Sequence, residues 1–510
     1  MRTNRFYIYL LSFLEGGAVM ACELLGAKML APYFGTSLYV WAAALGLTLG
    51  GLMSGYFLGG IVSRRFANNE VLLYWLLVLA GCALFAMPFT SKWVMELTLG
   101  LNLQLGAMLS LLVFMFPPLV FMGMVSPVII NILTESAKEA GSRAGTVYAI
   151  STLGGILTTF LMGFYVIPEF GLKHPAIAAG LLLALLPAIS LFRMKNKMAL
   201  PVWGLLLALG VTVWGAATQP DDVWKIHYHS EGVLGQVKVI DFQPFEDQPQ
   251  RSFRGLVVNN TLQTVLELGN PDKNFWHYTE VMVNLISQFP KGSKVLVLGM
   301  GGGTLVRQLV QAGYEVEAVE IDGRLEQLAK QYFNLPDDVP VFLDDARHFI
   351  KTTPSKYDVI IYDTFRGESA PEHVLTLESL ADTRDNLLPG GWLLVNFYGY
   401  WESERGAIGH AVFKTLSHAG FQTKVVATEG SEDDRNLVFW SRTDDGSLSA
   451  ELTGAQLGGE LLPVSSADTL GAVVLTDEQP QLRLYARAAA QWRKLYNDFY
   501  TKQFSRFKFF

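Results

Sequence analysis

Cysteine and charge are both scarce in this chain of 510 residues. Only Cys22 and Cys82 are present, each inside an apolar run, so the sequence supports neither a disulfide framework nor a cysteine-based metal site. We therefore expect no bound metal. Charged residues make up 17% of the chain, below the roughly 25% of an average soluble domain. The deficit lies in the first 218 residues, which hold only 12 Lys and Arg and 7 Asp and Glu.

An excess of basic residues is missing from the rest of the chain. The residues after 218 hold 27 Lys and Arg against 39 Asp and Glu, a net charge of −12, whereas the first part carries +5. Proteins that bind nucleic acids place basic residues over the contact surface, so we expect no nucleic-acid partner. An acidic surface is compatible with a small cationic substrate.

Long apolar runs dominate residues 1–218, and each is about long enough to cross a bilayer. The candidate spans are residues 6–29, 38–62, 71–88, 103–121, 144–167, 175–192 and 200–217. The first run lacks a small-residue cleavage signature and another run follows at once, so we expect a retained anchor and no signal peptide. Residues 1–218 are thus predicted to form a multi-pass helical domain of about seven spans in the lipid bilayer of the inner (cell) membrane.

The basic residues between these spans give a prediction of sidedness. They cluster at Arg2 and Arg5, at Arg64 and Arg65, at Lys138 and Arg143, and at Arg193, Lys195 and Lys197. Seven crossings place all four clusters on one side, which the positive-inside rule makes cytoplasmic, and leave the residues after 218 outside. The side stays open because a miscount within residues 92–133, which contain Pro117 and Pro118, would reverse it.

Two carboxylic acids, Glu15 and Glu23, lie within the first predicted span. An ionisable group is expensive inside a membrane and often marks a polar path or a substrate site. A bland role, with Glu15 near a helix end and Glu23 paired with Lys28, is equally open.

The soluble part begins with short alternating runs between residues 223 and 268, separated by Gly, Pro, Asn and Asp. This pattern predicts a small antiparallel β domain over residues 219–270. A helix over residues 274–288 should follow, carrying His277, Tyr278 and Glu280.

The stretch from Lys294 to Asp322 has the strongest pattern in the chain. The apolar run 295–298 predicts a buried strand, and the turn that follows contains Gly299, Gly301 and Gly303. A helix over 304–312 and a second strand over 316–319 come next, and Glu320 stands at the end of that strand. A glycine turn, a helix, a strand and a terminal acid in this order indicate a nucleoside-binding half-fold, with the carboxylate placed for ribose hydroxyls.

Acids also end the next two predicted strands. Residues 340–343 are followed by Asp344 and Asp345, and residues 357–362 by Asp363. A fifth strand over 392–396 and a hairpin of 422–426 with 437–441 complete a doubly wound α/β domain over residues 271–445. The carboxyl ends of parallel strands meet at one edge, so the acids should gather around a ligand there. The alternative is that Asp344 and Asp363 cap the helices that follow them.

These motifs give the soluble part a resemblance to the spermidine synthases, the polyamine aminopropyltransferases. Gln263 in NNTLQT, YTE at Tyr278–Glu280, EID at Glu320–Asp322, DDA at Asp344–Ala346 and DTF at Asp363–Phe365 carry it over residues 257–480. The opening FLEGGAVMACELLGAKMLAPYFGTSLY and the closing LTDEQP are similar to the branch in which such a domain follows a bundle of membrane helices.

The resemblance implies a Rossmann-like methyltransferase/spermidine-synthase fold and the transfer of an aminopropyl group from decarboxylated S-adenosylmethionine to an amine or polyamine such as putrescine. It makes Asp363 the catalytic carboxylate, assisted by Tyr278. The donor would be held by Gln263, Gly299, Gly301, Gly303, Glu320, Asp344, Asp345 and Ala346, and the acceptor by Glu280, Arg366 and His373. It leaves a homodimer open as the assembly. Residues 446–510 would form a C-terminal extension that ends in a basic-aromatic helix suited to a membrane surface.

Two departures from the family pattern keep other functions open. Gly302 stands where the family has an aspartate that holds the amine of the donor, and Arg366 stands where a second aspartate binds the diamine. An arginine there favours a carboxylate over an ammonium group. The alternatives are a methyltransferase or other transferase that uses intact S-adenosylmethionine on a membrane-associated acceptor, and a transporter or sensor with a non-catalytic nucleoside-binding domain.

Overall fold

The computed structural model describes the greater part of the chain. The described residues are 4–34, 38–66, 68–98, 101, 103–194, 225–232, 234–243, 251–259, 261–271, 275–364, 373–432, 435–443, 457–464, 471–479, 481 and 484. The chain clusters into two compact units, the first formed mainly by Met1–Asp222 and the second mainly by Val237–Phe509.

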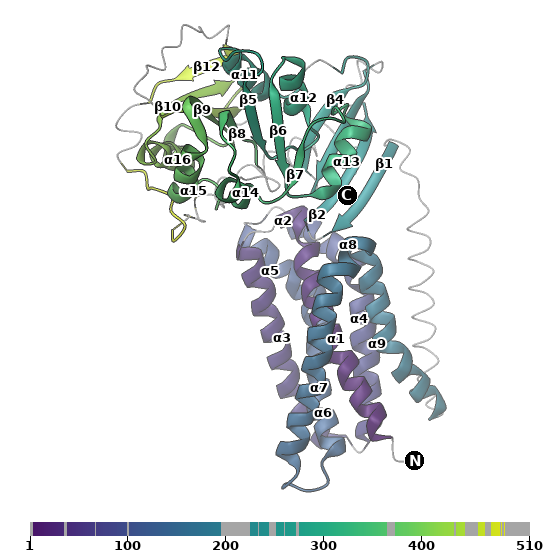
Figure 1. Ribbon diagram of the computed structural model, residues 1–510. Helices are drawn as coiled ribbons and strands as arrows, with labels where there is room; N and C mark the ends of the chain where they lie inside the picture. Colours follow the sequence, from purple (N-terminus) through teal and green to yellow (C-terminus); the bar gives the residue numbers. More distant parts are fainter. Residues whose placement is uncertain are drawn as a thin grey trace. The chain divides into compact units, whose positions relative to one another are not determined.

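The first unit is a helical bundle (Figure 1). Its helices are α1 (Arg5–Met29), α2 (Ala31–Phe34), α3 (Leu38–Arg65), α4 (Asn69–Thr98), α5 (Leu103–Phe114), α6 (Phe116–Leu133), α7 (Ala140–Leu161), which a π-helical turn (Met162–Val166) extends, α8 (Ile167–Phe170) and α9 (Lys173–Arg193). Among the described residues, six helices are long and apolar enough to cross a membrane. The expected seventh span, residues 200–217, lies outside them.

Two helices, α5 and α6, lie between α4 and α7, where a single span over residues 103–121 was expected. Here α5 ends at Phe114 and α6 begins at Phe116, so only Met115 separates the two helices. Pro117 and Pro118 occupy the first turn of α6, where a missing N–H costs no helical hydrogen bond. The prolines therefore start a new helix here, which composition alone does not distinguish from a kink.

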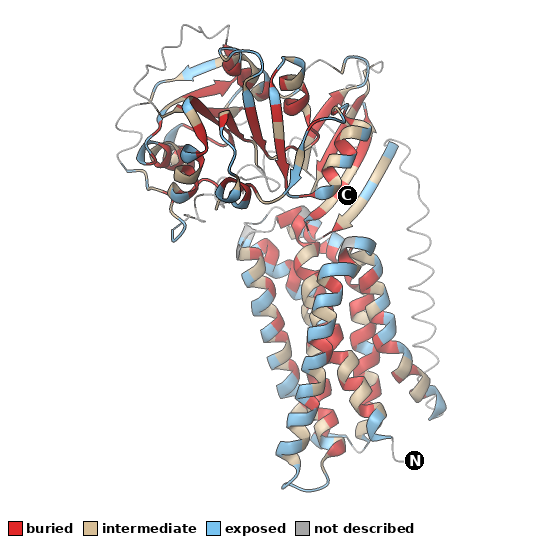
Figure 2. Cartoon of the chain, in the orientation of Figure 1, coloured by how far each residue is buried: buried red, intermediate tan, exposed pale blue. Residues whose placement is uncertain are grey.

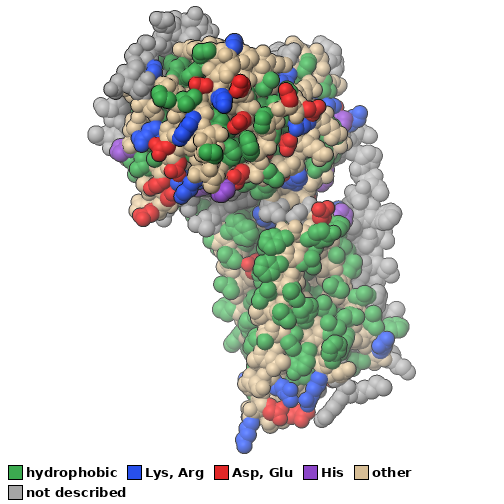
Figure 3. All heavy atoms as spheres, viewed as in Figure 1, with side chains coloured by type: hydrophobic (Ala, Val, Ile, Leu, Met, Phe, Trp, Pro, Cys, Tyr) green, Lys and Arg blue, Asp and Glu red, His purple; other side chains and the backbone are tan. Residues whose placement is uncertain are grey.

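Glycines let the helices of the bundle approach closely. A Cβ atom added at Gly59 on α3 would lie 2.6 Å from the carbonyl oxygen of Met124 on α6, and one at Gly81 on α4 would lie 2.6 Å from that of Gly180 on α9. Small residues at such crossings are typical of membrane helices. The outer face is apolar, with Leu49, Phe57 and Phe164 at least 69% exposed (Figures 2 and 3). This composition is compatible with a surface that faces lipid.

Inside the bundle, Glu15 is buried, with 3% of the residue exposed. The hydroxyl of Ser151 on α7 donates to its Oε2 at 3.1 Å. Glu15 lies in the middle of α1, so the expectation that it sits near a helix end is wrong.

The second unit begins with a four-stranded sheet in the order β1-β2-β3-β4. Its strands are β1 (Lys225–Gly232), β2 (Gly235–Phe242), β3 (Phe253–Val258) and β4 (Thr261–Glu267). The β2–β3 and β3–β4 pairs are antiparallel, as the alternating runs predict.

The main sheet has eight strands in the order β12-β10-β11-β9-β8-β5-β6-β7. Its strands are β5 (Lys294–Leu298), β6 (Glu315–Glu320), β7 (Val341–Leu343), β8 (Tyr357–Tyr362), β9 (Leu387–Tyr398), β10 (Gln422–Thr428), β11 (Asn436–Arg442) and β12 (Gly459–Leu462). Strands β7, β6, β5, β8 and β9 are parallel, and β11, β10 and β12 extend the sheet in antiparallel fashion.

Helices cover both faces of this sheet (Figure 1). The first apolar core joins it to α11 (His277–Ile286), α12 (Thr304–Gln311) and α13 (Gly323–Tyr332). The second joins it to α14 (Ala346–Thr352), α15 (Leu377–Asp385) and α16 (Ala407–His418). The predicted doubly wound fold is thereby confirmed. Strand β12 was not anticipated, and the expected basic-aromatic helix at the C-terminus lies outside the described residues.

Candidate active site

The turn after β5 adopts backbone conformations that favour glycine. Gly299, Gly301 and Gly303 have φ values of 88°, 55° and 77°, which side-chain-bearing residues rarely adopt. A Cβ at Gly299 would also collide with the backbone carbonyl of Asp363 at the end of the neighbouring strand β8. The turn thus brings the carboxyl ends of β5 and β8 into direct contact.

Glu320 closes the turn from the end of β6. Its Oε2 accepts from the N–H groups of Met300 at 3.0 Å and Gly301 at 3.1 Å, and its Oε1 accepts from the N–H of Asp322 at 3.0 Å. Burial raises the pKa of Glu320, and the three backbone donors oppose that rise. The carboxylate is therefore fixed beside the glycine turn, with about one of its four lone-pair sites left for a ligand hydroxyl.

The acids after β7 have separate roles. Asp345 caps α14, accepting from the N–H groups of Arg347 at 2.9 Å and His348 at 3.4 Å. Asp344 instead pairs with the imidazole of His348, whose Nδ1 lies 2.7 Å from its Oδ2. Asp345 also pairs with the Nε2 of His373 at 3.2 Å, and this hydrogen bond lowers the pKa of Asp345 to about 2. The capping role considered for Asp344 therefore belongs to Asp345.

Asp363 follows β8, half-buried at the carboxyl edge of the sheet. The hydroxyl of Tyr278 donates to its Oδ2 at 3.0 Å, and the Nδ2 of Asn396 donates to its Oδ1 at 2.7 Å. Burial raises the pKa of Asp363 to about 6, although both hydrogen bonds favour the ionised form. This carboxyl group is therefore poised to exchange a proton near neutral pH.

Sequence reasoning missed Asn396, which lies on β9 with 2% of the residue exposed. Its Oδ1 accepts from the Nδ2 of Asn436 on β11 at 2.9 Å. The signal was an amide side chain in the otherwise apolar run WLLVNF, at the end of the predicted fifth strand. A buried polar group there needs partners, and in this fold they come from β8 and β11.

Sequence reasoning also missed two exposed apolar residues, which lie next to Glu320 and Asp344 in the chain. Ile321 follows Glu320 and is 37% exposed, and Leu343 precedes Asp344 and is 70% exposed. Large apolar side chains at the carboxyl edge of a sheet offer a surface for a planar base.

The small sheet touches the glycine turn at Gly302. The N–H of Gly302 donates to Oγ1 of Thr264 on β4 at 2.9 Å. A Cβ at Gly302 would lie 2.6 Å from Cγ2 of Thr264, closer than real Cβ atoms come to a neighbour. Thr264 therefore leaves no room for a side chain at 302. Gln263, predicted to lie beside the nucleoside, is half-buried next to Thr264.

The remaining predicted residues fall in different places. Ala346 is the first residue of α14 and is buried. Glu280 is exposed in the first turn of α11, where its Cγ lies 3.8 Å from the position of a Cβ built at Gly458. Arg366 lies outside the described residues.

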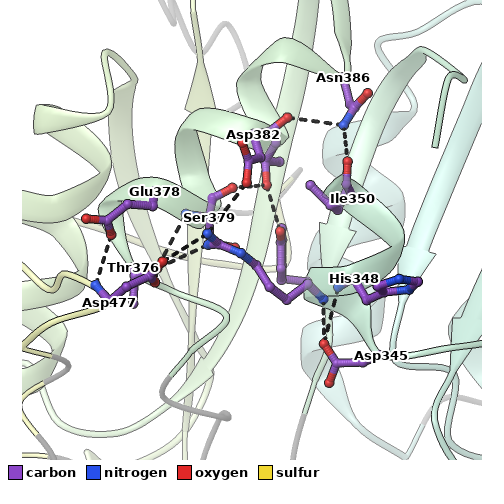
Figure 4. Close-up of polar contacts among 12 residues, drawn as sticks. Asp345, His348, Ile350, Thr376, Glu378, Ser379, Asp382, Asn386 and Asp477 are labelled. Atoms are coloured by element: carbon purple, nitrogen blue, oxygen red, sulfur yellow. Dashed lines mark hydrogen bonds and ion pairs between the residues drawn. The ribbon is translucent and has the colours of Figure 1, made fainter. Parts of the chain in front are cut away.

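Hydrogen bonds and an ion pair hold residues 475–477 against α14 and the start of α15 (Figure 4). Asp477 accepts from the hydroxyl of Thr376 at 2.6 Å and from the guanidinium of Arg347 at 3.2 Å. Its N–H donates to Glu378 at 3.0 Å, and the N–H of Leu377 donates to the carbonyl of Leu475 at 2.8 Å. We call residues 475–477 the C-terminal clasp. It ties α14 to the start of α15.

Comparisons with known proteins agree with this architecture. Residues 276–427 match the model of the spermine/spermidine synthase domain, which confirms the resemblance for this part of the chain. The chain is 35% identical over 127 residues to a probable polyamine aminopropyl transferase of Bifidobacterium longum, and the match covers 24% of this chain and 28% of that protein. It is 27% identical over 208 residues to a polyamine aminopropyltransferase of Clostridium beijerinckii, covering 37% of this chain and 72% of that protein.

Two further similarities are more distant in function or in structure. An N-terminal histidine N-methyltransferase of Emericella nidulans is 34% identical over 113 residues, 21% of this chain and 20% of that protein. A probable spermidine synthase from Corynebacterium glutamicum superposes with a TM-score of 0.37 at 18% identity, covering 53% of this chain and 94% of that one. The first two curated relatives are thus matched over less than a third of their length.

Proposed function

We propose that the spermine/spermidine synthase domain of this chain is an aminopropyltransferase that moves an aminopropyl group from decarboxylated S-adenosylmethionine to an amine, with Asp363 as the catalytic carboxylate. One observation carries the proposal. Asp363 is held between Tyr278 and Asn396, and its backbone contacts the glycine turn at Gly299. A proton-accepting group and a nucleoside-binding turn therefore meet at one edge of the sheet.

The proposed reaction is a direct displacement at carbon. The lone pair of the acceptor nitrogen forms a bond to the methylene next to the sulfonium, and the carbon–sulfur bond breaks with its electrons going to sulfur. The thioether leaves without needing an acid. The acceptor must attack as a neutral amine, so Asp363 takes the proton that its nitrogen gives up. Close alignment of the two substrates supplies the rest of the acceleration.

The donor would lie across the glycine turn. In this arrangement Glu320, fixed beside the turn, would bind the ribose hydroxyls and Asp344 the amino group of the base. The exposed Ile321 and Leu343 would offer an apolar surface beside them. His373 pairs with Asp345, so we assign it to the donor side and no longer to the acceptor. Arg366 remains the residue proposed to select the acceptor.

A comparison of donors tests the proposal. The full chain in detergent is incubated with decarboxylated or intact S-adenosylmethionine, each with putrescine and with a membrane extract, and the products are identified by mass spectrometry. Methylthioadenosine and spermidine from the decarboxylated donor, lost in Asp363→Asn, are the expected result. Binding of either donor without turnover would overturn the assignment and favour a sensor or transporter.

A second candidate is a methyltransferase or other transferase that uses intact S-adenosylmethionine. The contact of Thr264 with Gly302 favours it, because the turn then has no room for a carboxylate that would hold the free amine of the decarboxylated donor. S-adenosylhomocysteine formed from the intact donor in the same experiment would select this candidate.

A further inference from the structure

A series of side-chain hydrogen bonds leads to Asp363 from the two strands β11 and β9. The Nδ2 of Asn436 on β11 donates to Oδ1 of Asn396 on β9 at 2.9 Å, and the Nδ2 of Asn396 donates to Oδ1 of Asp363 after β8 at 2.7 Å. The backbone fixes both ends, because the N–H of Asn436 donates to Thr428 at 2.9 Å and that of Asp363 donates to Leu298 at 2.8 Å.

The direction of these hydrogen bonds matters because an amide group has a donor NH2 on one side and an acceptor oxygen on the other. If the amide of Asn396 turned over, its oxygen would face the carboxylate and its NH2 would face the NH2 of Asn436, so both contacts would become repulsive for an ionised Asp363. The Nδ2 of Asn436 faces the amide oxygen of Asn396 and therefore disfavours that orientation. Asn396 is almost wholly buried, so water cannot stand in for the missing partner.

We propose that Asn436 is a positioning residue that commits the amide of Asn396 to donate to Asp363, and thereby favours the ionised carboxylate that accepts the proton. The inference rests on the proposed function for its kinetic consequence. The ionisation of Asp363 that it predicts can be measured without turnover. Asn436 reaches Asp363 only through Asn396, so its effect should be on proton affinity and leave donor binding unchanged.

Two variants of Asn436 test the direction of these hydrogen bonds. Asn436→Leu removes the donor without adding charge, and Asn436→Asp replaces it with an acceptor that draws the NH2 of Asn396 away from Asp363. Ser441→Ala is the matched control. Ser441 is fully buried on β11, five residues after Asn436, and its hydroxyl forms a hydrogen bond with that of Thr423 on β10 at 2.9 Å.

The acidic limb of kcat/KM against pH is the decisive measurement. In Asn436→Leu it should move upward by about half to one pH unit, which is a three- to tenfold loss at pH values below the limb. Asn436→Asp should move it further. Activity should return to within twofold of the wild type above pH 8, with the KM for the donor unchanged, and Ser441→Ala should not move the limb. A loss that is equal at every pH, or a limb that stays in place, would overturn the inference.

A second readout separates this inference from the proposed function. The stability difference between each protein and its Asp363→Asn counterpart, followed by urea unfolding from pH 4 to 8, reports the ionisation of Asp363 directly. The midpoint of that difference should rise in the Asn436→Leu background even if no donor is turned over. An unchanged midpoint would refute the role of Asn436, whereas absent turnover with a shifted midpoint would refute only the proposed reaction.

Discussion

At Asp363, stability and the proposed function make opposite demands. Burial raises its pKa to about 6, so the folded state binds the proton more tightly than the unfolded state does. The unfolded chain releases this proton near pH 3.8, and the fold therefore loses stability as the pH rises from there to about 6. Above that window the penalty is constant and the carboxylate is ready to accept a proton.

We predict that Asp363→Asn loses activity by at least about 10²-fold, because the proposed proton acceptor is gone, and gains stability at pH 7. Urea unfolding of both proteins should give a stability gap that widens between about pH 4 and pH 6 and is flat above it. A gap that does not change with pH would mean that Asp363 titrates normally in the fold.

A side chain at position 302 is predicted to clash with Thr264 and to weaken donor binding. In Gly302→Ala the new Cβ would lie 2.6 Å from Cγ2 and 2.8 Å from Oγ1 of Thr264, so the contact between the small sheet and the glycine turn must open. Overpacking of this kind costs about 1–3 kcal/mol, and we expect donor binding to weaken at least tenfold. Isothermal titration with S-adenosylmethionine analogues measures this.

The double variant Gly302→Ala with Thr264→Gly removes the atoms in the way and should recover part of the affinity. Gly269→Ala is the control, since a Cβ there meets nothing within 4 Å. Equal losses in Gly302→Ala and Gly269→Ala would contradict the steric argument.

At the scale of elements, the C-terminal clasp supports a prediction about the stability of the second unit. Asp477 accepts hydrogen bonds from Thr376 and from the guanidinium of Arg347, which lie at the start of α15 and in α14. Hydrogen bonds to charged groups contribute about 1.5–3 kcal/mol each, less at an exposed site. We expect Asp477→Ala to lower the stability of the second unit by about 1–2 kcal/mol, measured by urea unfolding. The exposed neighbour variant Glu478→Ala should change it by less than about 0.5 kcal/mol.

The sequence predicted the central strands of the α/β domain well because they carry a local signal. Strand β5 is an apolar run followed by glycines. Strand β6 alternates glutamate with apolar residues and ends in Glu320, and the mostly apolar strand β8 is followed by Asp363. The link from Asn436 through Asn396 to Asp363 joins residues from 33 to 40 positions apart in sequence. Such contacts depend on strand order, which the local pattern does not contain. The cap of α14 is a local contact, and it belongs to Asp345 instead of Asp344 because the helix begins at Ala346, directly after Asp345.

At the scale of the whole molecule, arginines mark one end of the helical bundle. Arg5 at the start of α1 pairs with Glu135 just beyond α6 at 3.0 Å, and Asn69 at the start of α4 bonds Asn131 near the end of α6 at 3.1 Å. Helix α3 ends with Arg64 and Arg65, and α4 begins at Asn69. Basic residues at one end of a bundle are retained on the cytoplasmic side of a membrane.

We predict from this that the chain leaves α9 at Arg193 on the cytoplasmic side and that residues 200–217, as a seventh crossing, carry the catalytic domain to the other side. Alkaline phosphatase, active only outside the cytoplasm, and green fluorescent protein, fluorescent only inside when exported unfolded, are fused after Arg193 and after Lys291. Fluorescence at the first site and phosphatase activity at the second are expected. Fluorescence at both sites would mean that residues 200–217 do not cross. The catalytic domain would then meet its nucleoside donor in the cytoplasm, and an exported donor would not be required.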